Sequence, residues 1–480
     1  MHIVDMVFYW ARTAPHRPAV IQRSMVLTFQ TLAGGIESIG EHIDRLNLPK
    51  QEPVAVSIIN PAFMLATVFA LLRSGYCVAP IGVRRAPEIA AAGVRTVIYG
   101  AEGQIAAGTR NIRFDPSWLP DGQHEARPAQ HKRTPAENPD MIFFTSGTTG
   151  MPKKVIQPAG ALNERLRSPL ACGAGPYQKV LLLPGLTITF GFNFTCEVLN
   201  FGKTVCFSRA ENALSLIGLF DIDVVVVSAA QALGLADAKL KNPASKVDSL
   251  KAIYIGGGKV EPDGIARIRS ALCRDVINDY GSTEAGTALR SPFDALGDAP
   301  GGIPLPWVET EIVDDAGQQV PAGTPGAIRI RTPQLRETLK SAGPNQIRNT
   351  RDGWFYPGDV GSLDNDGALR LLGRSSDVIN RGGFKVSSTR IEEIVQTLPE
   401  IKEAAACAIL GSSGLEEIWI GVVPNGAIDV DRIKAHLREH EDVQIAPDEV
   451  IVLEDLPRGE LGKVQKPRLK ELMLAMRRGG

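Results

Sequence analysis

The residues with the most distinctive chemistry lie in one short segment, residues 145–153. Glycines let backbone N–H groups approach an anion closely, and hydroxyls add hydrogen-bond donors without bulk. A lysine adds a compact positive charge that can pair with phosphate. The segment therefore predicts a polyphosphate-binding loop, although it lacks the G-x-x-x-x-G-K-[ST] spacing of a Walker A loop. Its residues are Thr145, Ser146, Gly147, Thr148, Thr149, Gly150, Met151, Pro152 and Lys153.

Residues 141–144, directly before this segment, are apolar and are predicted to form a buried strand. Such a strand would deliver the hydroxyls, glycines and lysine into a loop at its carboxyl end. A second interpretation stays open here, because surface turns also favour serine, threonine and glycine. Composition alone does not separate a phosphate-binding loop from a turn without a ligand.

Four further motifs follow downstream, at residues 280–284, 356–359, 373–377 and 456–463. In sequence and order, all five segments resemble the signatures of the adenylate-forming superfamily. This superfamily comprises acyl- and aryl-CoA synthetases, peptide-synthetase adenylation domains and luciferases. The resemblance spans nearly the whole chain. It implies that the protein uses ATP and Mg²⁺ to convert a carboxylic acid into an acyl-adenylate, with release of pyrophosphate.

Attack of a carboxylate on the α-phosphorus of ATP depends chiefly on positioning and on neutralising crowded negative charge. By the resemblance, residues 145–153 hold the β and γ phosphates, and adenine stacks between residues 256–258 and Tyr280. Asp359 would accept hydrogen bonds from the ribose hydroxyls, with Arg374 beside the ribose. The full set of implied ATP-binding residues is Thr145, Ser146, Gly147, Thr148, Thr149, Gly150, Gly257, Tyr280, Gly281, Ser282, Thr283, Asp359 and Arg374.

Three residues are implied to be catalytic: Lys463, Glu284 and Lys153. Glu284 would be the magnesium ligand, because a hard carboxylate suits Mg²⁺. The alternative is a carboxylate at the start of a helix, where negative charge is favourable. Lys463 would bridge the carboxylate and the α-phosphate in the transition state, as a fixed charge. The alternative for Lys463 is a solvated surface lysine.

The acid-binding pocket is implied to involve Thr187, Thr189, Phe190, Gly191 and Gly256. Residues 187–193 resemble the pocket strand of aryl-CoA ligases, which favours an aromatic acid; the alternative is that these residues belong to the core. The family often has a histidine followed two residues later by an aromatic residue, and this chain has threonines at those two positions. The departure weakens any substrate assignment copied from common members.

Gly383 resembles the glycine that lines the pantetheine tunnel of the family, which favours transfer to a thiol, most simply that of coenzyme A. The alternative acceptor is the phosphopantetheine of a carrier protein, and a further alternative is a non-catalytic nucleotide-binding homologue. Ser376 stands at the family's hinge position, where Asp or Lys is usual. Rotation remains feasible, because a hinge needs only to tolerate backbone change.

The overall composition excludes several other classes of protein. A formal net charge of -1 argues against a nucleic-acid-binding surface, which requires clustered positive charge. The longest apolar run, residues 62–72, is too short to cross a bilayer, and the first residues do not resemble a signal peptide. Six scattered cysteines favour a reducing compartment. We expect a cytoplasmic monomer or homodimer without membrane insertion, whose partners are a small carboxylic acid and, in the alternative, a carrier protein.

Apolar runs alternate with helical patterns along the first 280 residues, as in βαβ units with a parallel sheet. The predicted fold class is α/β: a large N-terminal domain of parallel-sheet subdomains plus a small β region, then a small mobile α+β domain. We expect the domains to comprise residues 1–374 and 375–480. The predicted strands of the parallel sheets are residues 53–59, 76–80, 141–144, 179–184, 205–207, 223–228, 251–255 and 276–279.

Overall fold

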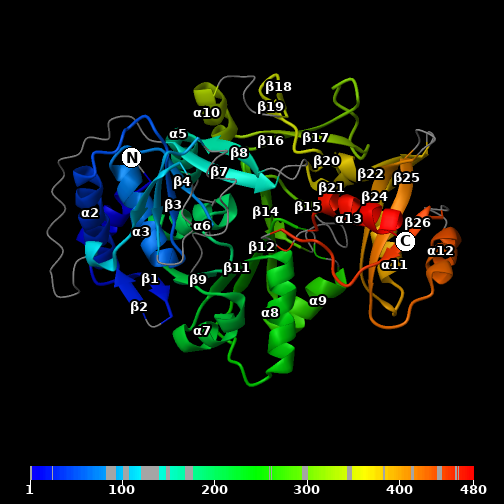
Figure 1. The fold of residues 1–480 in the computed structure, drawn as a ribbon, viewed down its shortest axis with the longest axis horizontal. Coiled ribbons are helices and arrows are strands. Elements are labelled where there is room, and N and C mark those ends of the chain that lie inside the picture. The colour runs from blue at the N-terminus through cyan, green and yellow to red at the C-terminus, as the bar shows by residue number, and fades with distance from the viewer. Residues whose placement is uncertain are drawn as a thin grey trace. The chain divides into compact units, whose positions relative to one another are not determined.

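The chain forms two compact units in the computed structural model (Figure 1). Unit 1 comprises Met1–Gly147, Met151–Thr310 and Ile330–Phe355, and unit 2 comprises Thr148–Gly150, Glu311–Arg329 and Tyr356–Gly480. The predicted domain boundary after residue 374 falls inside unit 2 and stays a prediction. The residues that the structure describes are 3–23, 25–82, 93–100, 108–119, 140–146, 152–167, 177–258, 260, 262–293, 301–342, 349–381, 384–411, 416–440, 446–459, 462 and 464–479.

An eight-stranded sheet of unit 1 has the order β14-β13-β12-β11-β9-β10-β1-β2. The six strands from β13 to β1 are parallel, and the edge strands β14 and β2 are antiparallel to their neighbours. The strands are β1 (Pro18–Gln22), β2 (Met25–Thr28), β9 (Lys179–Leu182), β10 (Thr204–Phe207), β11 (Val224–Ser228), β12 (Ala252–Gly256), β13 (Asp275–Ser282) and β14 (Gly286–Pro292).

Both faces of this sheet are buried, which explains the continuous β-branched run of β11. Val224 and Val226 belong to the core shared with helix α6, whereas Val225 and Val227 belong to the core shared with α7, α8 and α9. These helices are α6 (Thr189–Asn200), α7 (Ala213–Phe220), α8 (Ala229–Lys241) and α9 (Pro262–Ala271).

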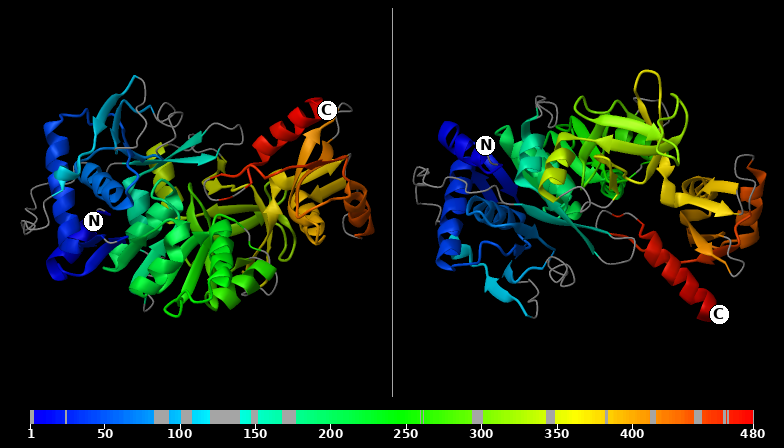
Figure 2. Two further views of the ribbon diagram at one scale, coloured as in Figure 1. Left: turned by 60° about the horizontal axis from the view of Figure 1, so that its bottom comes forward. Right: turned by 90° about the horizontal axis from the view of Figure 1, so that it is seen from above.

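A second sheet of unit 1 has six strands in the order β6-β5-β3-β4-β7-β8, parallel except for β8. Figure 2 shows β7 and β8 as adjacent cyan arrows. The strands are β3 (Val54–Ser57), β4 (Val78–Pro80), β5 (Thr96–Tyr99), β6 (Arg110–Arg113), β7 (Met141–Ser146) and β8 (Pro152–Gln157). The other helices of unit 1 are α1 (Asp5–Thr13), α2 (Phe29–Arg45), α3 (Pro61–Arg73), α5 (Ala159–Arg167), α10 (Pro333–Ala342) and the short η1 (Pro116–Trp118) and η2 (Ala210–Asn212).

Short strands follow, and β17 (Gly326–Arg331) crosses from unit 2 into unit 1. Its first residues pair with β20, which in turn pairs with β21. Its last residues pair with β19, which pairs with β18. The predicted small β region is therefore present. The remaining strands of this region are β15 (Gly301–Gly302), β16 (Glu309–Val313), β18 (Thr350–Arg351), β19 (Trp354–Phe355), β20 (Asp359–Leu363) and β21 (Leu369–Arg374).

The rest of unit 2 has an α+β arrangement, in which the β24-β25-β26 sheet carries apolar cores on both faces. The predicted α/β class with a small α+β C-terminal part is confirmed. The elements are η3 (Ser375–Asp377), β22 (Val378–Arg381), β23 (Phe384–Ser387), α11 (Ser388–Gln396), β24 (Ile401–Leu410), β25 (Glu416–Pro424), α12 (Val430–Glu439), β26 (Glu449–Val452) and α13 (Lys466–Gly479). In the described part of the chain, every helix is too short or too polar to cross a membrane.

Candidate active site

The predicted phosphate-binding segment begins and ends within paired strands. Thr145 pairs with Lys153 and Ser146 with Pro152, so these residues extend the β7–β8 hairpin, where the sequence predicted a loop. Strand β8 lies at the edge of the sheet, and its side chains alternate between exposed (Lys154, Ile156) and buried. This alternation is typical of a strand with one face in solvent, so the segment is suited to strand pairing. Of the remaining predicted phosphate contacts, Gly147, Thr148, Thr149 and Gly150 lie outside the described residues.

The 280–284 motif also belongs largely to a hairpin. Strand β13 continues through Tyr280, Gly281 and Ser282, and it pairs with the antiparallel β14. A Cβ atom on Gly281 would lie 2.3 Å from the carbonyl oxygen of Gly286, so only glycine fits this close approach of two strands. Glu284 lies in the hairpin turn and no helix follows, so the helix-start alternative for Glu284 is wrong.

The carbonyl oxygen of Thr283 holds this turn against two other parts of unit 1. It accepts a hydrogen bond from Nε2 of Gln157 at 2.7 Å and a longer one from Nε2 of Gln334 at 3.4 Å. Gln157 ends β8, the second strand of the phosphate-segment hairpin. The Thr283 hydroxyl also lies 3.4 Å from the hydroxyl of Thr189. Thr283 therefore connects the phosphate segment, the predicted magnesium turn and the start of α6.

The predicted pocket segment, residues 187–193, is not a strand. Thr187 lies in a turn, and Thr189, Phe190 and Gly191 form the first turn of helix α6. Helix α6 is buried around most of its circumference, so its sequence lacks one exposed polar face, and the periodicity of hydrophobic residues does not separate a buried helix from a buried strand. A Cβ on Gly191 would lie 2.5 Å from the carbonyl oxygens of Pro184 and Gly185, so its small size serves the backbone packing of α6.

Gly256 ends β12 in direct contact with α6. A Cβ atom there would lie 2.6 Å from Cζ of Phe190, so the absence of a side chain makes room for the aromatic ring. Gly257 follows with φ +78, a conformation that favours glycine. The structure therefore brings together two predicted acid-pocket residues, Gly256 and Phe190.

The two predicted ribose-side residues are also adjacent. Asp359 begins β20 and Arg374 ends β21, and the two residues are cross-strand partners. Nε of Arg374 lies 3.2 Å from Oδ1 of Asp359. The carboxylate side chain is 13% exposed and the arginine side chain 49% exposed, so an outer ligand can reach the pair. Both belong to unit 2.

Ser376 lies in the short η3 helix, directly after Arg374 and Ser375. Gly383 and Lys463, the predicted tunnel glycine and catalytic lysine, lie outside the described residues. Lys466, three residues beyond Lys463, is anchored at the start of α13. Its Nζ lies 3.0 Å from Oε1 of Glu392 and 3.4 Å from Oδ1 of Asp377.

The oxygen donors in the 283–284 turn fit a magnesium ion that is bound together with a nucleotide. Among the described residues, no group of three or more His, Cys, Asp or Glu side chains is arranged to hold a metal by itself. Mg²⁺ typically takes one or two carboxylates and completes its shell with phosphate oxygens and water. The Glu284 carboxylate and the Thr283 hydroxyl, both in the hairpin turn, are oxygen donors of this kind.

The fold and the arrangement of motifs define an adenylate-forming enzyme. The family model described as AMP-binding enzyme matches residues 7–338, more than half of the chain, and the chain belongs to this family. The predicted superfamily is thereby confirmed. The protein is thus an AMP-binding enzyme of the adenylate-forming superfamily.

Three comparisons describe its relatives. An indoleacetate–CoA ligase from Aromatoleum aromaticum is 27% identical over 506 residues, covering 98% of this chain and 98% of the relative. A long-chain-fatty-acid–CoA ligase from Thermus thermophilus is 28% identical over 370 residues, covering 71% and 67%. The structure of O-succinylbenzoate coenzyme A synthetase from Bacillus subtilis, in complex with ATP and magnesium ion, aligns with a TM-score of 0.81 at 21% identity, covering 97% and 99%. At that identity, the structural likeness supports the fold alone.

Sequence reasoning missed several residues around the site. Gln157 and Gln334 carry no distinctive motif, and only the fold brings them to Thr283. Asp279 and Glu197 do carry a signal, because each is a charged residue inside an otherwise apolar segment. A charged side chain is rarely buried unless it is paired, and Arg290 is the partner of both.

Proposed function

We propose that this enzyme joins a carboxylic acid to coenzyme A in two half-reactions. In the first, a carboxylate oxygen attacks the α-phosphorus of ATP, the bond from that phosphorus to the bridging oxygen breaks, and pyrophosphate leaves. In the second, the thiol sulfur attacks the acyl carbonyl and AMP leaves, while the thiol proton passes to solvent. The names of the CoA-ligase relatives support coenzyme A as the acceptor.

The observation that carries the proposal is the position of Thr283. Hydrogen bonds hold its turn to β8, whose first two residues end the phosphate segment, and to Thr189, at the start of the acid-pocket helix. Acid and nucleotide must be held in one fixed geometry for carboxylate attack, because positioning supplies much of the rate. A single turn that contacts both segments suits that requirement.

The proposed roles follow from this arrangement and from the motifs. Residues 145–153 bind the β and γ phosphates, and Glu284 holds Mg²⁺, which would offset negative charge on the phosphate oxygens. Asp359 binds the ribose hydroxyls and Arg374 orients that carboxylate. Lys463 places a fixed positive charge between the carboxylate and the α-phosphorus.

The test is isotopic exchange of pyrophosphate into ATP, measured with Mg²⁺ and a panel of aromatic and aliphatic acids. We expect exchange only when a suitable acid is present. Folded protein that shows no exchange across the whole panel would contradict the proposal. A second assay then identifies the acceptor. It compares the formation of an acyl-CoA thioester from coenzyme A with the formation of an acyl thioester on a holo-carrier protein.

Gly383→Leu separates the two half-reactions. We expect this variant to retain pyrophosphate exchange and to lose thioester formation, because the added side chain would obstruct the pantetheine arm. Equal loss of both half-reactions would assign Gly383 to the fold or the ATP site.

A further inference from the structure

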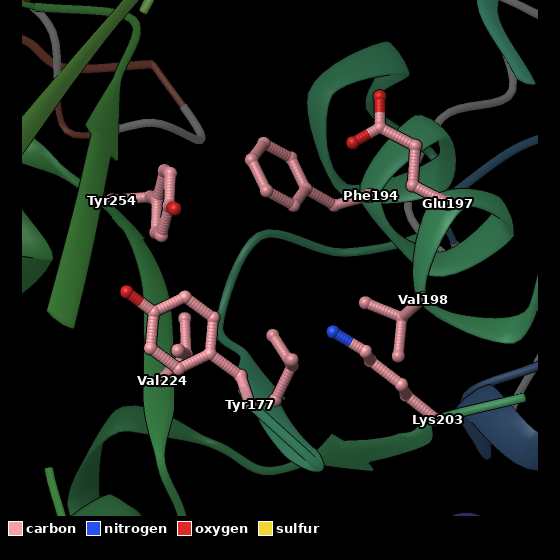
Figure 3. A pocket seen from close by; sticks show the side chains of 8 residues that line it. Tyr177, Phe194, Glu197, Val198, Lys203, Val224 and Tyr254 are labelled. Atoms are coloured by element: carbon pink, nitrogen blue, oxygen red, sulfur yellow. The ribbon is translucent and has the colours of Figure 1, made fainter. Parts of the chain in front are cut away.

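Figure 3 shows a cavity on the α6 face of the eight-stranded sheet, with Tyr177, Phe194 and Tyr254 among the residues that line it. The cavity has room for about one water molecule, so neither a carboxylic acid nor a nucleotide fits there. In parallel sheets, ligands bind instead at the carboxyl ends of the strands. Strand β13 ends at Ser282, and the turn after it carries Glu284.

This turn is held by hydrogen bonds on both sides of Glu284. Before it, the carbonyl oxygen of Thr283 accepts the two glutamine amides described above. After it, the backbone N–H of Ala285 donates a hydrogen bond of 3.0 Å to Oγ of Ser282. The carbonyl oxygen of Ala285 accepts a further bond of 2.7 Å from the hydroxyl of Thr332, 47 residues along the chain.

These bonds restrict the backbone of Glu284. Each peptide group is planar, so the backbone at one residue rotates only about φ and ψ. The peptide plane before Glu284 is held through the carbonyl oxygen of Thr283, and the plane after it through the N–H of Ala285. Holding both planes limits both rotations, and with them the direction of the Cα–Cβ bond. The Glu284 carboxylate is therefore carried on a backbone of restricted freedom.

Thr332 lies between β17 and α10, and it caps the helix. Its hydroxyl oxygen accepts a hydrogen bond of 3.0 Å from the N–H of Leu335. A helix cap needs only this acceptor, whereas the Thr332 hydroxyl also donates its proton to Ala285. Thr332 and Ala285 are almost completely buried, so the carbonyl would gain no water in place of the hydroxyl. The second hydrogen bond serves the turn and not the helix.

Gln334, the second residue of α10, contacts both ends of the same turn. Its Nε2 lies 3.4 Å from the carbonyl oxygen of Thr283. A Cβ atom on Gly286 would lie 2.4 Å from Oε1 of Gln334, and the φ of +79 at Gly286 is one that favours glycine. The beginning of α10 and the turn are thus packed together, and both belong to unit 1.

We propose that Thr332 is a positioning residue for the magnesium-binding carboxylate of Glu284. The inference rests on the proposed function, in which Glu284 holds Mg²⁺ together with ATP. Thr332 acts through the Ala285 carbonyl: its hydroxyl holds the turn before the metal binds, so less backbone freedom is lost on binding. Groups behind a metal ligand commonly tune the affinity for the metal in this way.

The experiment measures ATP binding by isothermal titration calorimetry, without an acid substrate, once with Mg²⁺ and once with EDTA. The ratio of the two Kd values gives the gain in ATP affinity that the metal supplies. Thr332→Val keeps the shape of the side chain but removes the hydroxyl. We expect this variant to lower the gain about threefold to tenfold, as for loss of one hydrogen bond, with an unchanged Kd in EDTA. Thr332→Ser, which retains the hydroxyl, should keep the gain close to that of the wild type.

Two further variants calibrate the measurement. Glu284→Gln removes the charge of the proposed ligand and should abolish most of the gain. Thr28→Val is the matched control, because Thr28 caps α2 through a hydrogen bond of 3.1 Å from the N–H of Thr31, and α2 carries no residue assigned to the site. It removes a capping hydroxyl of the same kind and should leave the gain as in the wild type.

The outcomes separate the two proposals. If Glu284→Gln leaves the gain unchanged, Glu284 does not hold Mg²⁺, and both its role and the inference fail. If Glu284→Gln abolishes the gain but Thr332→Val retains it, the role of Glu284 stands and that of Thr332 is overturned. The same holds if Thr332→Ser or Thr28→Val lowers the gain as much as Thr332→Val does. Should Thr332→Val not fold, Thr332→Ala removes the same hydroxyl and takes its place in the comparison.

Discussion

The side-chain amide of Gln157 donates a hydrogen bond of 2.7 Å to the carbonyl oxygen of Thr283, 126 residues further along the chain. Gln157 ends β8, the strand into which the phosphate segment runs, and Thr283 lies in the turn that carries Glu284. The Gln157 side chain is almost completely buried. A buried amide–carbonyl bond is expensive to break, since the carbonyl loses its partner without gaining water. The two predicted nucleotide-binding segments are thereby held together.

Gln157→Leu tests this link. The change leaves the Thr283 carbonyl with only the longer bond from Gln334, so the turn should lose its position relative to the phosphate segment. We expect KM for ATP in pyrophosphate exchange to rise about fivefold to tenfold, consistent with the roughly 1–1.5 kcal/mol of a single hydrogen bond. Gln51→Leu, at an exposed site, is the matched control. An unchanged KM for ATP would show that the hydrogen bond does not position the turn.

The close approach of β13 and β14 predicts that replacing Gly281 destabilises the protein. Gly281→Ala would place a methyl group 2.3 Å from the carbonyl oxygen of Gly286, so the strands must separate. We expect loss of at least about 2 kcal/mol of unfolding free energy, a size typical of overpacking, together with loss of exchange activity. Gly234→Ala in α8 is the control, because a Cβ there meets no atom within 4 Å. That control should be neutral or stabilising by up to about 1 kcal/mol. Denaturant titration measures both variants.

Lys463→Ala should act on one half-reaction only. We expect adenylate formation to slow by about 10²- to 10³-fold, the effect of losing one preorganised charge donor. Supplied with preformed acyl-adenylate, the variant should still make thioester at close to the wild-type rate, because one domain pose is expected for each half-reaction. Lys402→Ala, at an exposed position of the same unit, is the control. Equal loss of both half-reactions would contradict the expectation that each half-reaction uses its own domain orientation.

Lys466 supports unit 2 through its ion pairs with Glu392 and Asp377 and a 2.7 Å hydrogen bond to the hydroxyl of Ser388. Lys466→Met would leave two largely buried carboxylates without their cation. We expect a loss of about 3–5 kcal/mol in unfolding free energy at pH 8, the typical effect of breaking a buried pair. Glu392→Gln combined with Lys466→Met should recover part of that loss. If the Lys466→Met variant is as stable as the wild type, these ion pairs contribute nothing to the free energy of unfolding.

The contribution of Lys466 to the free energy of unfolding should depend on pH in the alkaline range. Burial, the largest influence, lowers the pKa of Lys466, but attraction to Glu392 and Asp377 outweighs it and leaves the pKa above 10.5. A pKa raised on folding stabilises the protein fully below the unfolded value, and the contribution is lost as the pH rises through the folded value. The stability difference between wild type and Lys466→Met should therefore shrink above about pH 10.5. Denaturation midpoints at pH 8 and 11 measure it.

One buried thiol, Cys206, and two partly buried thiols, Cys77 and Cys273, should be unreactive. Burial raises the pKa of Cys77 and of Cys206 to about 12, and that of Cys273 to about 11. At pH 8 only about one thiol in 10³ to 10⁴ is then the reactive thiolate. We expect native protein to resist iodoacetamide at these three positions and denatured protein to react readily. Rapid labelling of any of them in the native protein, detected by peptide mass spectrometry, would contradict the raised pKa values.

The local sequence was sufficient to predict features that depend on short-range patterns. The run of β-branched residues at 223–228 predicted a strand buried on both faces, and β11 is that strand. The family was recognisable from five short motifs, because phosphate binding and adenylation require particular residue types at fixed spacing. Asp359 and Arg374 were assigned to one ribose site from motif order, and the sheet places them as cross-strand partners.

Tertiary packing decided the rest. Thr187 lies in a turn and residues 189–193 begin helix α6, where the sequence suggested a strand, because a segment that is buried on most sides lacks the exposed polar face that reveals its period. Glu284 occupies a hairpin turn because β14 returns against β13, a pairing that no local pattern predicted. The contacts of Thr283 with Gln157, and of Arg290 with Glu197 and Asp279, join residues 11 to 126 positions apart. Such contacts depend on which strands and helices lie side by side, and only the folded chain determines that.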